Sequence, residues 1–339
     1  MDKIFVIDLI EGEPVTSFFL ARQIQMRQRW KGDPFLTLVL ADRTGEVSAV
    51  MWDGAEQVAK DLTEGDIVKA QGILGTYQGE RQLTLSRVRP AAPEEISLDD
   101  YLPRSLQDSA ALLGDLRETV ERFQNPHLQR LLCDLLADAS FVEALVSAPA
   151  AKAIHHAVLG GLLEHTVSVV GLCRLLADYY PALDRDLLLT AAVLHDVGKI
   201  RELTWDRVFD YTDAGRLLGH ITLGTILVEE RIRAIPGFPE GLAQRLLHCI
   251  VSHHGELEWG SPKRPKTLEA LVLHYAEDLD GKVNSFLGFV QSHPDPQHPG
   301  WTQFNRALDR YLHFGRGGDG APPRSGSAPD GLGGAGDSE

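Results

Sequence analysis

The sequence predicts two domains of different class: a small β-barrel in residues 1–90 and an all-helical domain in residues 106–314. Three observations predict this division. Up to position 90, short apolar runs of strand length are separated by turn residues. A Pro-rich stretch, residues 89–95, then breaks every periodicity, and we assign residues 91–105 to a linker. Beyond Leu106 the apolar residues recur at helical spacing, and a chain of 339 residues is long enough to bury both cores.

The expected strands of the N-terminal domain are short and are bounded by turn residues. They are 18–25, 35–40, 47–52, 66–75 and 82–88. Turns are expected at residues 42–45 and near Gln78-Gly79, and a short helix is expected over 55–62. Five strands with a small helix between the third and the fourth is the element order of an OB-fold barrel.

The expected helices of the second domain are recognised by apolar residues at a period near 3.6. They span residues 128–136, 141–146, 157–176, 186–197, 222–232, 242–253 and 267–283. The helices at 157–176 and 186–197 are strongly apolar, which is typical of buried helices. Residues 315–339 are mostly Gly, Pro, Ser and Asp, with almost nothing to bury, so we expect a disordered tail.

Composition argues against several classes of protein. The formal net charge of −15 excludes a general nucleic-acid coat, but residues 1–90 hold 11 basic and 13 acidic side chains, so a local basic face there is compatible. No apolar run reaches the roughly 18 residues of a membrane span, and no signal peptide is evident. Three scattered cysteines, Cys133, Cys173 and Cys249, suggest reduced thiols in a cytoplasmic protein.

The pair His195-Asp196 is the most informative motif of the helical domain. An apolar run over residues 187–194 leads straight into it, and Gly198 then offers a helix end. Apolar packing would strip the Asp196 carboxylate of water at the negative pole of the helix dipole. A cation must offset that charge, and the neighbouring imidazole suggests a metal ion. A salt bridge from Asp196 to a Lys or Arg is the alternative.

Other imidazoles and carboxylates lie at helix ends or on inner helix faces. His165 shares a helical face with Val158, Leu162, Val169 and Leu172, so it points inward. A histidine hydrogen-bonded within the core is the alternative for that residue taken alone. The remaining candidates follow in chain order: His220, the pair His253-His254, and the acidic cluster at residues 277–280. Such ligands on separate helices of a bundle can build a metal centre.

This order of motifs resembles the HD-domain superfamily of metal-dependent phosphohydrolases over roughly residues 150–314. The resemblance implies that His165, His195 and Asp196 are ligands of a first metal ion. The last ligand is usually the Asp of an Ala-Asp pair, whereas here Glu277 follows Ala276, with Asp278 next. The choice between Glu277 and Asp278 therefore stays open. His220, His253 and His254 match positions that carry extra ligands in multi-metal members, so the site would hold one or two divalent ions.

The chemistry that such a site supports is phosphoester hydrolysis, in which cations neutralise the phosphate and activate a water molecule. Asp196 and Lys199 are the expected catalytic residues, with Lys199 balancing charge on the phosphate. A lysine complementing the helix dipole is the alternative for Lys199. His155 and His156 precede the first apolar helix and are candidates for substrate contact, or else simple surface residues.

A basic strip in the N-terminal domain suggests a nucleic-acid surface. Residues 22–31 contain Arg27, Arg29 and Trp30 and no acid, and strand alternation puts the two arginines on one face. Cations along a backbone and aromatic rings under bases are what single-strand binding requires. Three further residues would extend this surface: Trp52, Tyr77 and Arg81. A solvated barrel edge is the alternative.

The two domains together resemble the YhaM family of 3′→5′ exoribonucleases, on residues 154–157, 160–166 and 274–276. The resemblance implies stepwise hydrolysis of single-stranded RNA, with single-stranded DNA left open, and a divalent cation such as Mn²⁺. Two rival functions are a phosphohydrolase of small nucleotides and a non-catalytic single-strand-binding protein. The intact set His165, His195 and Asp196 weighs against the second rival. We expect no membrane association, and homo-oligomerisation stays open.

Overall fold

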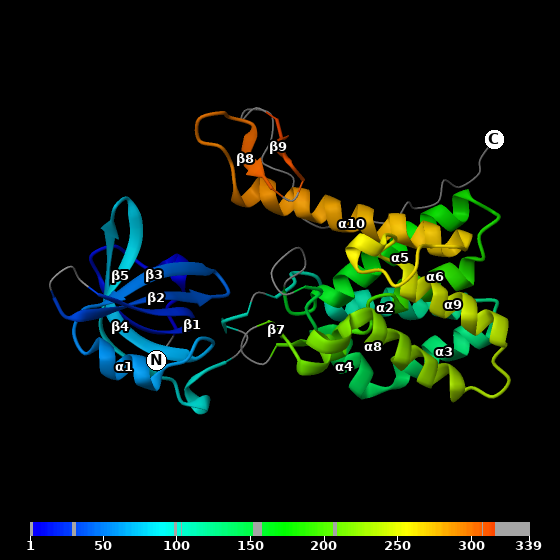
Figure 1. Ribbon diagram of the computed structural model, residues 1–339, viewed down its shortest axis with the longest axis horizontal. Coiled ribbons are helices and arrows are strands. Elements are labelled where there is room, and N and C mark those ends of the chain that lie inside the picture. Colours follow the sequence, from blue (N-terminus) through cyan, green and yellow to red (C-terminus); the bar gives the residue numbers. More distant parts are fainter. Residues whose placement is uncertain are drawn as a thin grey trace, which may run out of the picture.

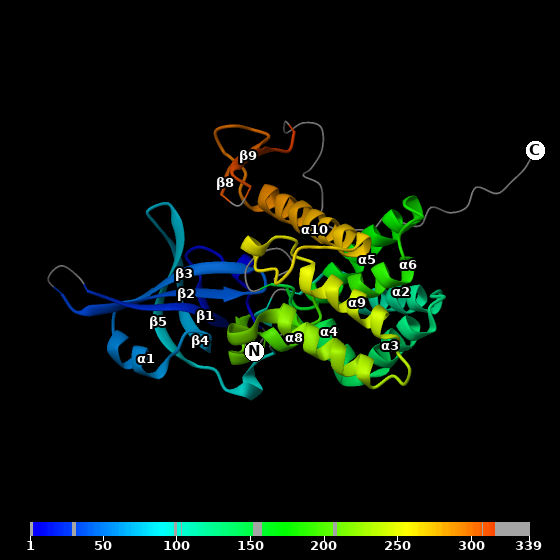
Figure 2. The ribbon, with the colours of Figure 1, turned by 45° about the vertical axis from the view of Figure 1, so that its right-hand side comes forward.

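The structure is a computed structural model that describes residues 3–28, 32–97, 100–102, 104–151, 158–205, 209–306 and 308–315. A β-barrel and a helical domain lie side by side, and the long last helix runs along the helical domain (Figure 1). The view turned by 45° shows the same two bodies (Figure 2). The predicted fold class, an OB-fold barrel followed by a helical bundle, is confirmed.

Five strands close the barrel in the order β1-β2-β3-β5-β4. Their bounds are β1 Pro14–Gln28, β2 Pro34–Asp42, β3 Gly45–Met51, β4 Ile67–Tyr77 and β5 Glu80–Pro90. Helix α1, Ala55–Asp61, lies between β3 and β4 as expected. Apolar side chains on alternate strand positions fill the interior, among them Phe19, Leu36 and Leu83. Each expected strand is therefore present, although β1 is longer than expected.

The extra length of β1 has a structural reason. Its first part, from Pro14 to Leu20, pairs with β4, and its second part, from Leu20 to Gln28, pairs with β2. A register shift between Ala21 and Gln23 separates the two parts. A bulge bends a strand, so one strand can serve two neighbours and close the barrel. The sequence pattern alone marked only the central part of β1.

The described residues of the predicted linker pack against the barrel. Tyr101 is 1% exposed and joins a small apolar cluster with Phe18 and Ile67, and Ile96 lies against the same cluster. Glu95 holds Arg89 through two hydrogen bonds of 2.7 and 2.8 Å. Residues 91–102 are therefore an ordered extension of the barrel rather than a free connection, as far as the structure describes them.

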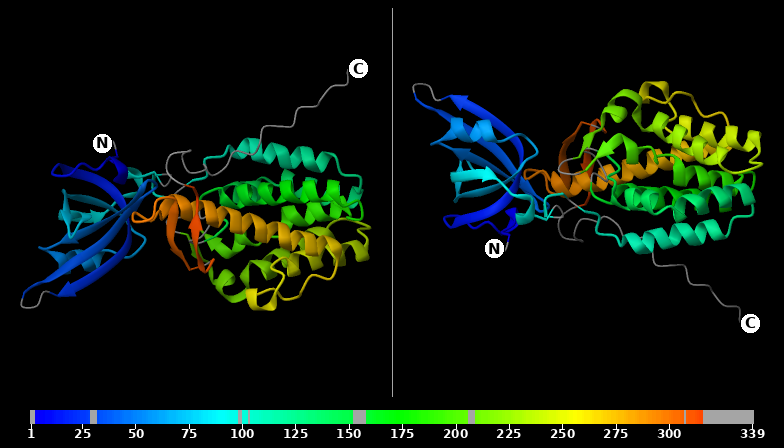
Figure 3. Two further views of the ribbon diagram at one scale, coloured as in Figure 1. Left: turned by 90° about the horizontal axis from the view of Figure 1, so that it is seen from above. Right: turned by 90° about the horizontal axis from the view of Figure 1, so that it is seen from below.

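The helical domain contains α2 Ser109–Glu121, α3 Pro126–Ala137, α4 Ala139–Ser147, α5 Gly161–Tyr179, α6 Arg185–Leu194, α7 Lys199–Glu202, α8 Asp213–Arg233, α9 Glu240–Ser252 and α10 Leu268–Ser292. Helices α5 and α6 run through the middle of this domain (Figure 3). Residues 187–194 of α6 are all buried, and the one polar side chain among them, Thr190, donates to the carbonyl of Asp186 at 2.7 Å. None of the described helices combines the length and apolar character that a membrane span requires.

Gly198 was expected to end a helix, and this expectation is wrong. Helix α6 already ends at Leu194, and Gly198 has right-handed backbone angles of φ −64° and ψ −18°. A Cβ atom at this position would lie 1.9 Å from the carbonyl oxygen of His220. Gly198 is therefore needed because α8 crosses the backbone here at close range, which brings His220 beside Asp196.

The end of the chain also departs from the helical expectation. Helix α10 stops at Ser292, two residues before Pro294, because His293, which directly precedes the proline, is disfavoured in the helix. Two strands follow, β8 Trp301–Asn305 and β9 Arg310–His313, and they form a hairpin. A second short pair, β6 Leu203–Thr204 and β7 Asp210–Tyr211, lies between α7 and α8. The predicted tail falls, beyond Gly315, outside the described residues.

Candidate metal centre and nucleic-acid interface

Asp196 lies at the centre of a cluster of imidazoles in the helical domain. Its Oδ2 atom is 3.5 Å from Nε2 of His165, on α5, and 3.5 Å from Nε2 of His195, its neighbour in the chain. The two imidazole nitrogens are themselves 3.2 Å apart. These three residues are buried, and their nearest ligand atoms lie within 4.8 Å of one another, as a metal site requires.

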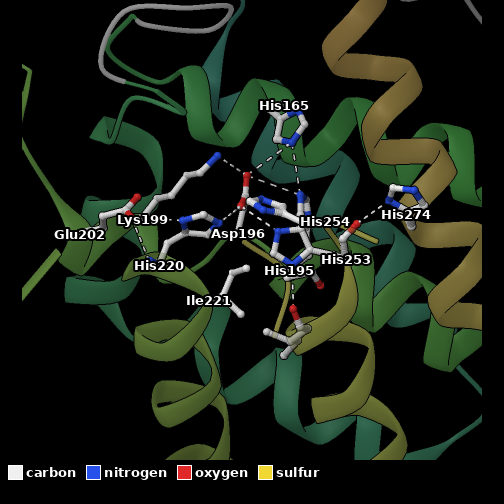
Figure 4. A network of polar contacts seen from close by, with 12 residues as sticks. His165, His195, Asp196, Lys199, Glu202, His220, Ile221, His253, His254 and His274 are labelled. Atoms are coloured by element: carbon white, nitrogen blue, oxygen red, sulfur yellow. Dashed lines mark hydrogen bonds and ion pairs between the residues drawn. The ribbon is translucent and has the colours of Figure 1, made fainter. Parts of the chain in front are cut away.

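A second group of histidines faces the other oxygen of the same carboxylate. Oδ1 of Asp196 is 3.4 Å from Nε2 of His220, on α8, and 3.6 Å from Nε2 of His253, which follows α9. His254 completes this second group, whose ligand atoms also lie within 4.8 Å of one another. Figure 4 shows the rings gathered around Asp196 from several helices. The carboxylate therefore lies between two groups of possible metal ligands.

Backbone carbonyls fix the direction of three of these rings. His195 donates from Nδ1 to the carbonyl of Ala192 at 2.8 Å, and His253 donates to Ile250 at 2.7 Å. His254 donates in the same way to Trp259 at 2.9 Å. A ring that donates from one nitrogen presents the other nitrogen as a lone-pair donor to a metal. In each case that nitrogen is Nε2.

Carboxylates take the place of these carbonyls behind the other two rings. Asp280, on α10, accepts a hydrogen bond from Nδ1 of His165 at 2.7 Å and another from Ser168. Glu202, on α7, accepts from both Nδ1 and the backbone N–H of His220, at 3.2 and 2.9 Å. The sequence pattern did not indicate these supporting roles of Asp280 and Glu202. For Asp280, its position three residues after Glu277, on the same helical face, could have indicated that it points toward the cluster.

His274 was also missed as a supporting residue. It lies on α10, is buried, and donates from Nδ1 to the backbone carbonyl of His253 at 2.9 Å (Figure 4). Its ring lies against Gly255, where a Cβ atom would come within 2.3 Å of the ring. Gly255 also has a left-handed φ of +79°, so the turn after His254 needs glycine for two reasons.

The charges of the cluster suit a metal site. Burial lowers the pKa of His195 and His253, and it lowers that of His254 to about 4, so these rings are neutral near pH 7. Burial alone would raise the pKa of Asp196, but the Lys199 ammonium and the surrounding imidazoles outweigh it and hold this pKa well below its usual range. Neutral imidazoles and an ionised carboxylate are the forms that bind metals.

Three buried atoms of the cluster lack a hydrogen-bond partner among the described residues: Asp196 Oδ1, His220 Nε2 and His253 Nε2. Buried polar atoms without partners are costly, and such exceptions often mark a functional site. Both imidazole nitrogens face Asp196 Oδ1, at 3.4 and 3.6 Å. Imidazole nitrogens and a carboxylate oxygen in this arrangement fit a divalent cation.

Lys199 pairs with Asp196. It opens the short helix α7, and its ammonium bonds to Oδ2 of Asp196 at 2.5 Å. The salt bridge that is the alternative explanation for the buried Asp196 carboxylate is therefore present. It involves only Oδ2, whereas Oδ1 faces His220 and His253.

The two candidates for the last ligand have different surroundings. Burial and the negative charge of Asp196 raise the pKa of Glu277 to about 8. Asp278 instead pairs with Lys282, one helical turn further along α10, at 2.6 Å. His155 and His156 lie outside the described residues.

On the barrel, Arg27 borders a polar groove of about 200 Å³ that crosses β1, β2 and β3. Gln23, Gln25 and Thr37 line it with Gln82 of β5. Phe35 pairs with Arg27 across the strands, and its ring lies 4.8 Å from that of Trp52. A cation beside two rings on a polar strand face is suited to a single strand. Arg27 and Trp52 are expected here from the sequence, whereas Phe35 is an addition from the structure.

Tyr77 and Arg81, near the turn between β4 and β5, lie on opposite faces of these strands. Tyr77 is 60% exposed and, by strand alternation, shares the face of Gln82. Arg81 lies on the opposite face and donates to the carbonyl of Leu9 at 2.7 Å, so it does not extend the groove. Arg29 and Trp30 lie outside the described residues.

Comparison with known proteins agrees with both domains. A family model described as the HD domain matches residues 162–282, and one described as an OB-fold nucleic acid binding domain matches residues 24–91. The chain is 37% identical over 275 residues to "3′-5′ exoribonuclease YhaM" of Bacillus velezensis, covering 80% of this chain and 86% of that protein. It is 36% identical over 278 residues to the Bacillus subtilis protein of the same name, with the same coverage. The chain therefore belongs to the YhaM family.

Proposed function

We propose that this protein is a metal-dependent 3′→5′ exoribonuclease that removes nucleotides from single-stranded RNA. The observation that carries the proposal is the position of Asp196 between two histidine groups, where three buried atoms have no hydrogen-bond partner in the described part of the chain. The HD-domain match covers this cluster, and the OB-fold match covers most of the polar groove on the barrel. We assign the reaction by analogy with the relatives, which are named as 3′-5′ exoribonucleases.

We assign the first cation site to His165, His195, Asp196 and Glu277, and the second to Asp196, His220, His253 and His254. Mn²⁺ is our choice of ion because it accepts both imidazole and carboxylate ligands. Bound divalent cations would supply positive charge to the phosphate and lower the pKa of a water molecule. In the reaction, water adds to the phosphorus of the terminal linkage, one sugar oxygen leaves, and that oxygen takes up a proton.

The residues around the ligands have separate tasks in this proposal. Asp280 and Glu202 hold the rings of His165 and His220 at fixed angles, so that Nε2 faces Asp196. Lys199 keeps Asp196 ionised through its hydrogen bond to Oδ2. Apolar helices around Asp196 exclude bulk water, which strengthens every charge interaction in the site.

The test is an assay with 5′-labelled single-stranded RNA of about 20 nucleotides, with and without Mn²⁺. We expect a ladder of products that shortens one nucleotide at a time from the 3′ end, and no products in EDTA. A circular RNA of the same sequence should stay intact. Single internal cuts, or cleavage of free nucleotides alone, would refute the proposal. Single-stranded DNA of the same sequence, run in parallel, decides whether the sugar matters.

A further inference from the structure

The hairpin of β8 and β9 carries four aromatic rings on one face. Trp301 pairs with His313 across the strands, and Phe304 pairs with Tyr311. Tyr311 and His313 are two residues apart and therefore share a face of β9. A bulge between Trp301 and Phe304 brings these two residues into register with that same face. The ring centres are 4.7 Å apart in the first pair and 5.2 Å apart in the second.

These rings are open to solvent although the hairpin itself is anchored. Trp301, Phe304 and Tyr311 are 43%, 45% and 60% exposed. Thr302 and Leu312, on the opposite face, are buried, and β8 packs against α10. Exposed aromatic residues of this number on one small hairpin are a surface that binds something. The anchored opposite face holds them in a fixed arrangement.

A hollow of about 480 Å³ lies beside two of the rings. Trp301 and Tyr311 line it together with Gln297, His298 and Asp295. Asp295 is already engaged, since it accepts hydrogen bonds from the backbone N–H of Gln297 and from His298, both at 2.8 Å. Both carboxylate oxygens of Asp295 are therefore already hydrogen-bonded, and the hollow offers aromatic faces and the amide of Gln297 to a ligand. Arg306 and Arg310 lie exposed at the turn end of the same hairpin.

The position of the hairpin connects it to the metal centre. It follows α10, the helix that carries Glu277 and Asp280, and lies at the end of α10 nearer to the barrel (Figures 1 and 2). From Glu277 to the end of α10 at Ser292 is about 22 Å at 1.5 Å per residue. Stacked nucleotides, at about 3.4 Å each, would cover that distance in roughly six or seven residues.

We propose that this hairpin is a stacking site for bases of single-stranded RNA, several nucleotides upstream of the linkage that is cut. The inference rests on the proposed exoribonuclease function and names a contact with the same substrate outside the barrel. Flat exposed rings beside a hollow, with arginines at the edge and no free carboxylate in the lining, match the chemistry of a nucleobase and its phosphates. A binding partner without planar groups would gain little from this arrangement.

The first test measures binding without cleavage. The affinity of a labelled 20-nucleotide RNA is measured by fluorescence anisotropy in EDTA for the parent protein, Trp301→Ala, Tyr311→Ala and Trp301→Phe. We expect roughly 5- to 100-fold weaker binding for each alanine variant, and near-parental binding for Trp301→Phe, which keeps a ring. Tyr179→Ala is the matched control. Tyr179 is 75% exposed and is the last residue of α5, in the helical domain.

The second test compares substrates of 20 and 4 nucleotides with Mn²⁺. The ratio of kcat/KM for the long RNA to that for the short RNA should fall by a similar factor in both alanine variants, because the short RNA cannot reach the hairpin. Circular dichroism checks that each variant is folded. If Trp301→Ala does not fold, Tyr311→Ala alone tests the proposal. A parent protein that binds RNA but never shortens it would refute the proposed function separately from the hairpin site.

Two outcomes would overturn the hairpin proposal. One is parental RNA affinity and a parental length ratio in both folded alanine variants. The other is a change in molecular mass by light scattering in these variants, with RNA affinity unchanged. That second result would assign the rings to contact with another copy of the chain.

Discussion

Asp280 accepts a hydrogen bond from Nδ1 of His165 at 2.7 Å and thereby directs Nε2 of that ring toward Asp196. The two residues are 115 positions apart in the chain and come from α10 and α5. This contact joins the last long helix to the first helix of the metal centre. It also makes the orientation of a proposed ligand depend on a residue that would not touch the metal.

Replacing this supporting carboxylate should weaken metal binding without removing a ligand. For Asp280→Asn we expect about 10- to 100-fold lower affinity for Mn²⁺, because His165 loses its charged acceptor. Isothermal titration calorimetry of the purified protein measures this change. Asp134→Asn is the control, since Asp134 forms an exposed ion pair with Arg130 on α3. Equal Mn²⁺ affinity in Asp280→Asn and the parent would show that the contact does not tune the site.

Metal removal should destabilise the parent protein and leave an Asp196 variant unaffected. When the cation is present at 100 times its dissociation constant, binding adds about 2.7 kcal/mol to the free energy of unfolding. EDTA should therefore lower the thermal midpoint of the parent. Asp196→Asn, which weakens both ligand groups, should show the same midpoint with and without EDTA, and elemental analysis should find little bound metal. An EDTA effect of parental size in this variant would place the metal elsewhere.

The two acidic neighbours on α10 should behave differently. Glu277→Gln should reduce bound Mn²⁺ and RNA hydrolysis at least tenfold, because we assign this carboxylate, whose pKa the charge of Asp196 raises, to the first cation site. Asp278→Asn should cost at most about 1 kcal/mol of stability and keep metal content, because its pair with Lys282 lies at the helix surface. Metal analysis and the 20-nucleotide assay on both variants decide between them. Loss of metal in Asp278→Asn alone would reverse our assignment.

Gly198→Ala should damage the site through the backbone. The added Cβ would meet the carbonyl of His220 at 1.9 Å and the backbone nitrogen of Gly224 at 2.5 Å, so α8 must move away. We expect a loss of about 3 kcal/mol or more in the free energy of unfolding, at or above the upper end of overpacking effects. Chemical denaturation measures it. Gly114→Ala is the control: it lies in α2 with nothing within 4 Å of the added carbon, so a gain of roughly 0.5–1 kcal/mol is expected.

Charge reversal on the barrel should change how RNA binding responds to salt. Arg27→Glu should weaken binding of the 20-nucleotide RNA and flatten the dependence of log affinity on log salt, because fewer counterions are released. Trp52→Ala should cost roughly 1–3 kcal/mol of binding if its ring stacks on a base. Anisotropy titrations at several salt concentrations measure both effects. Arg122→Glu, at the exposed end of α2, is the control, and equal slopes for the two charge reversals would argue against the groove.

Much of the fold could be predicted because its signals are local. The strands of the barrel show alternation that any window of a few residues reveals, and residues 187–194, all of them buried, are apolar except for Thr190. The imidazole set could be predicted for the same reason: each of His165, His195 and His253 lies on a strongly apolar helix or at its end, where a polar side chain is conspicuous.

The tertiary structure decided what depends on contacts between distant segments. Asp280 and Glu202 look like ordinary acids until folding places them 2.7 and 3.2 Å from ring nitrogens of His165 and His220. Gly198 reads as a helix end in the sequence, whereas the backbone of α8 makes glycine necessary there.

The difference between Glu277 and Asp278 was also beyond the sequence. Adjacent residues on a helix point about 100° apart, and periodicity gave both a plausible face. Only the packing of α10 against the rest of the domain fixes the rotation of the helix about its axis. In that packing the charge of Asp196 raises the pKa of Glu277, and Asp278 pairs with Lys282. The sequence by itself determined which residue types gather along the helices, and the packing of those helices determined which side chains meet.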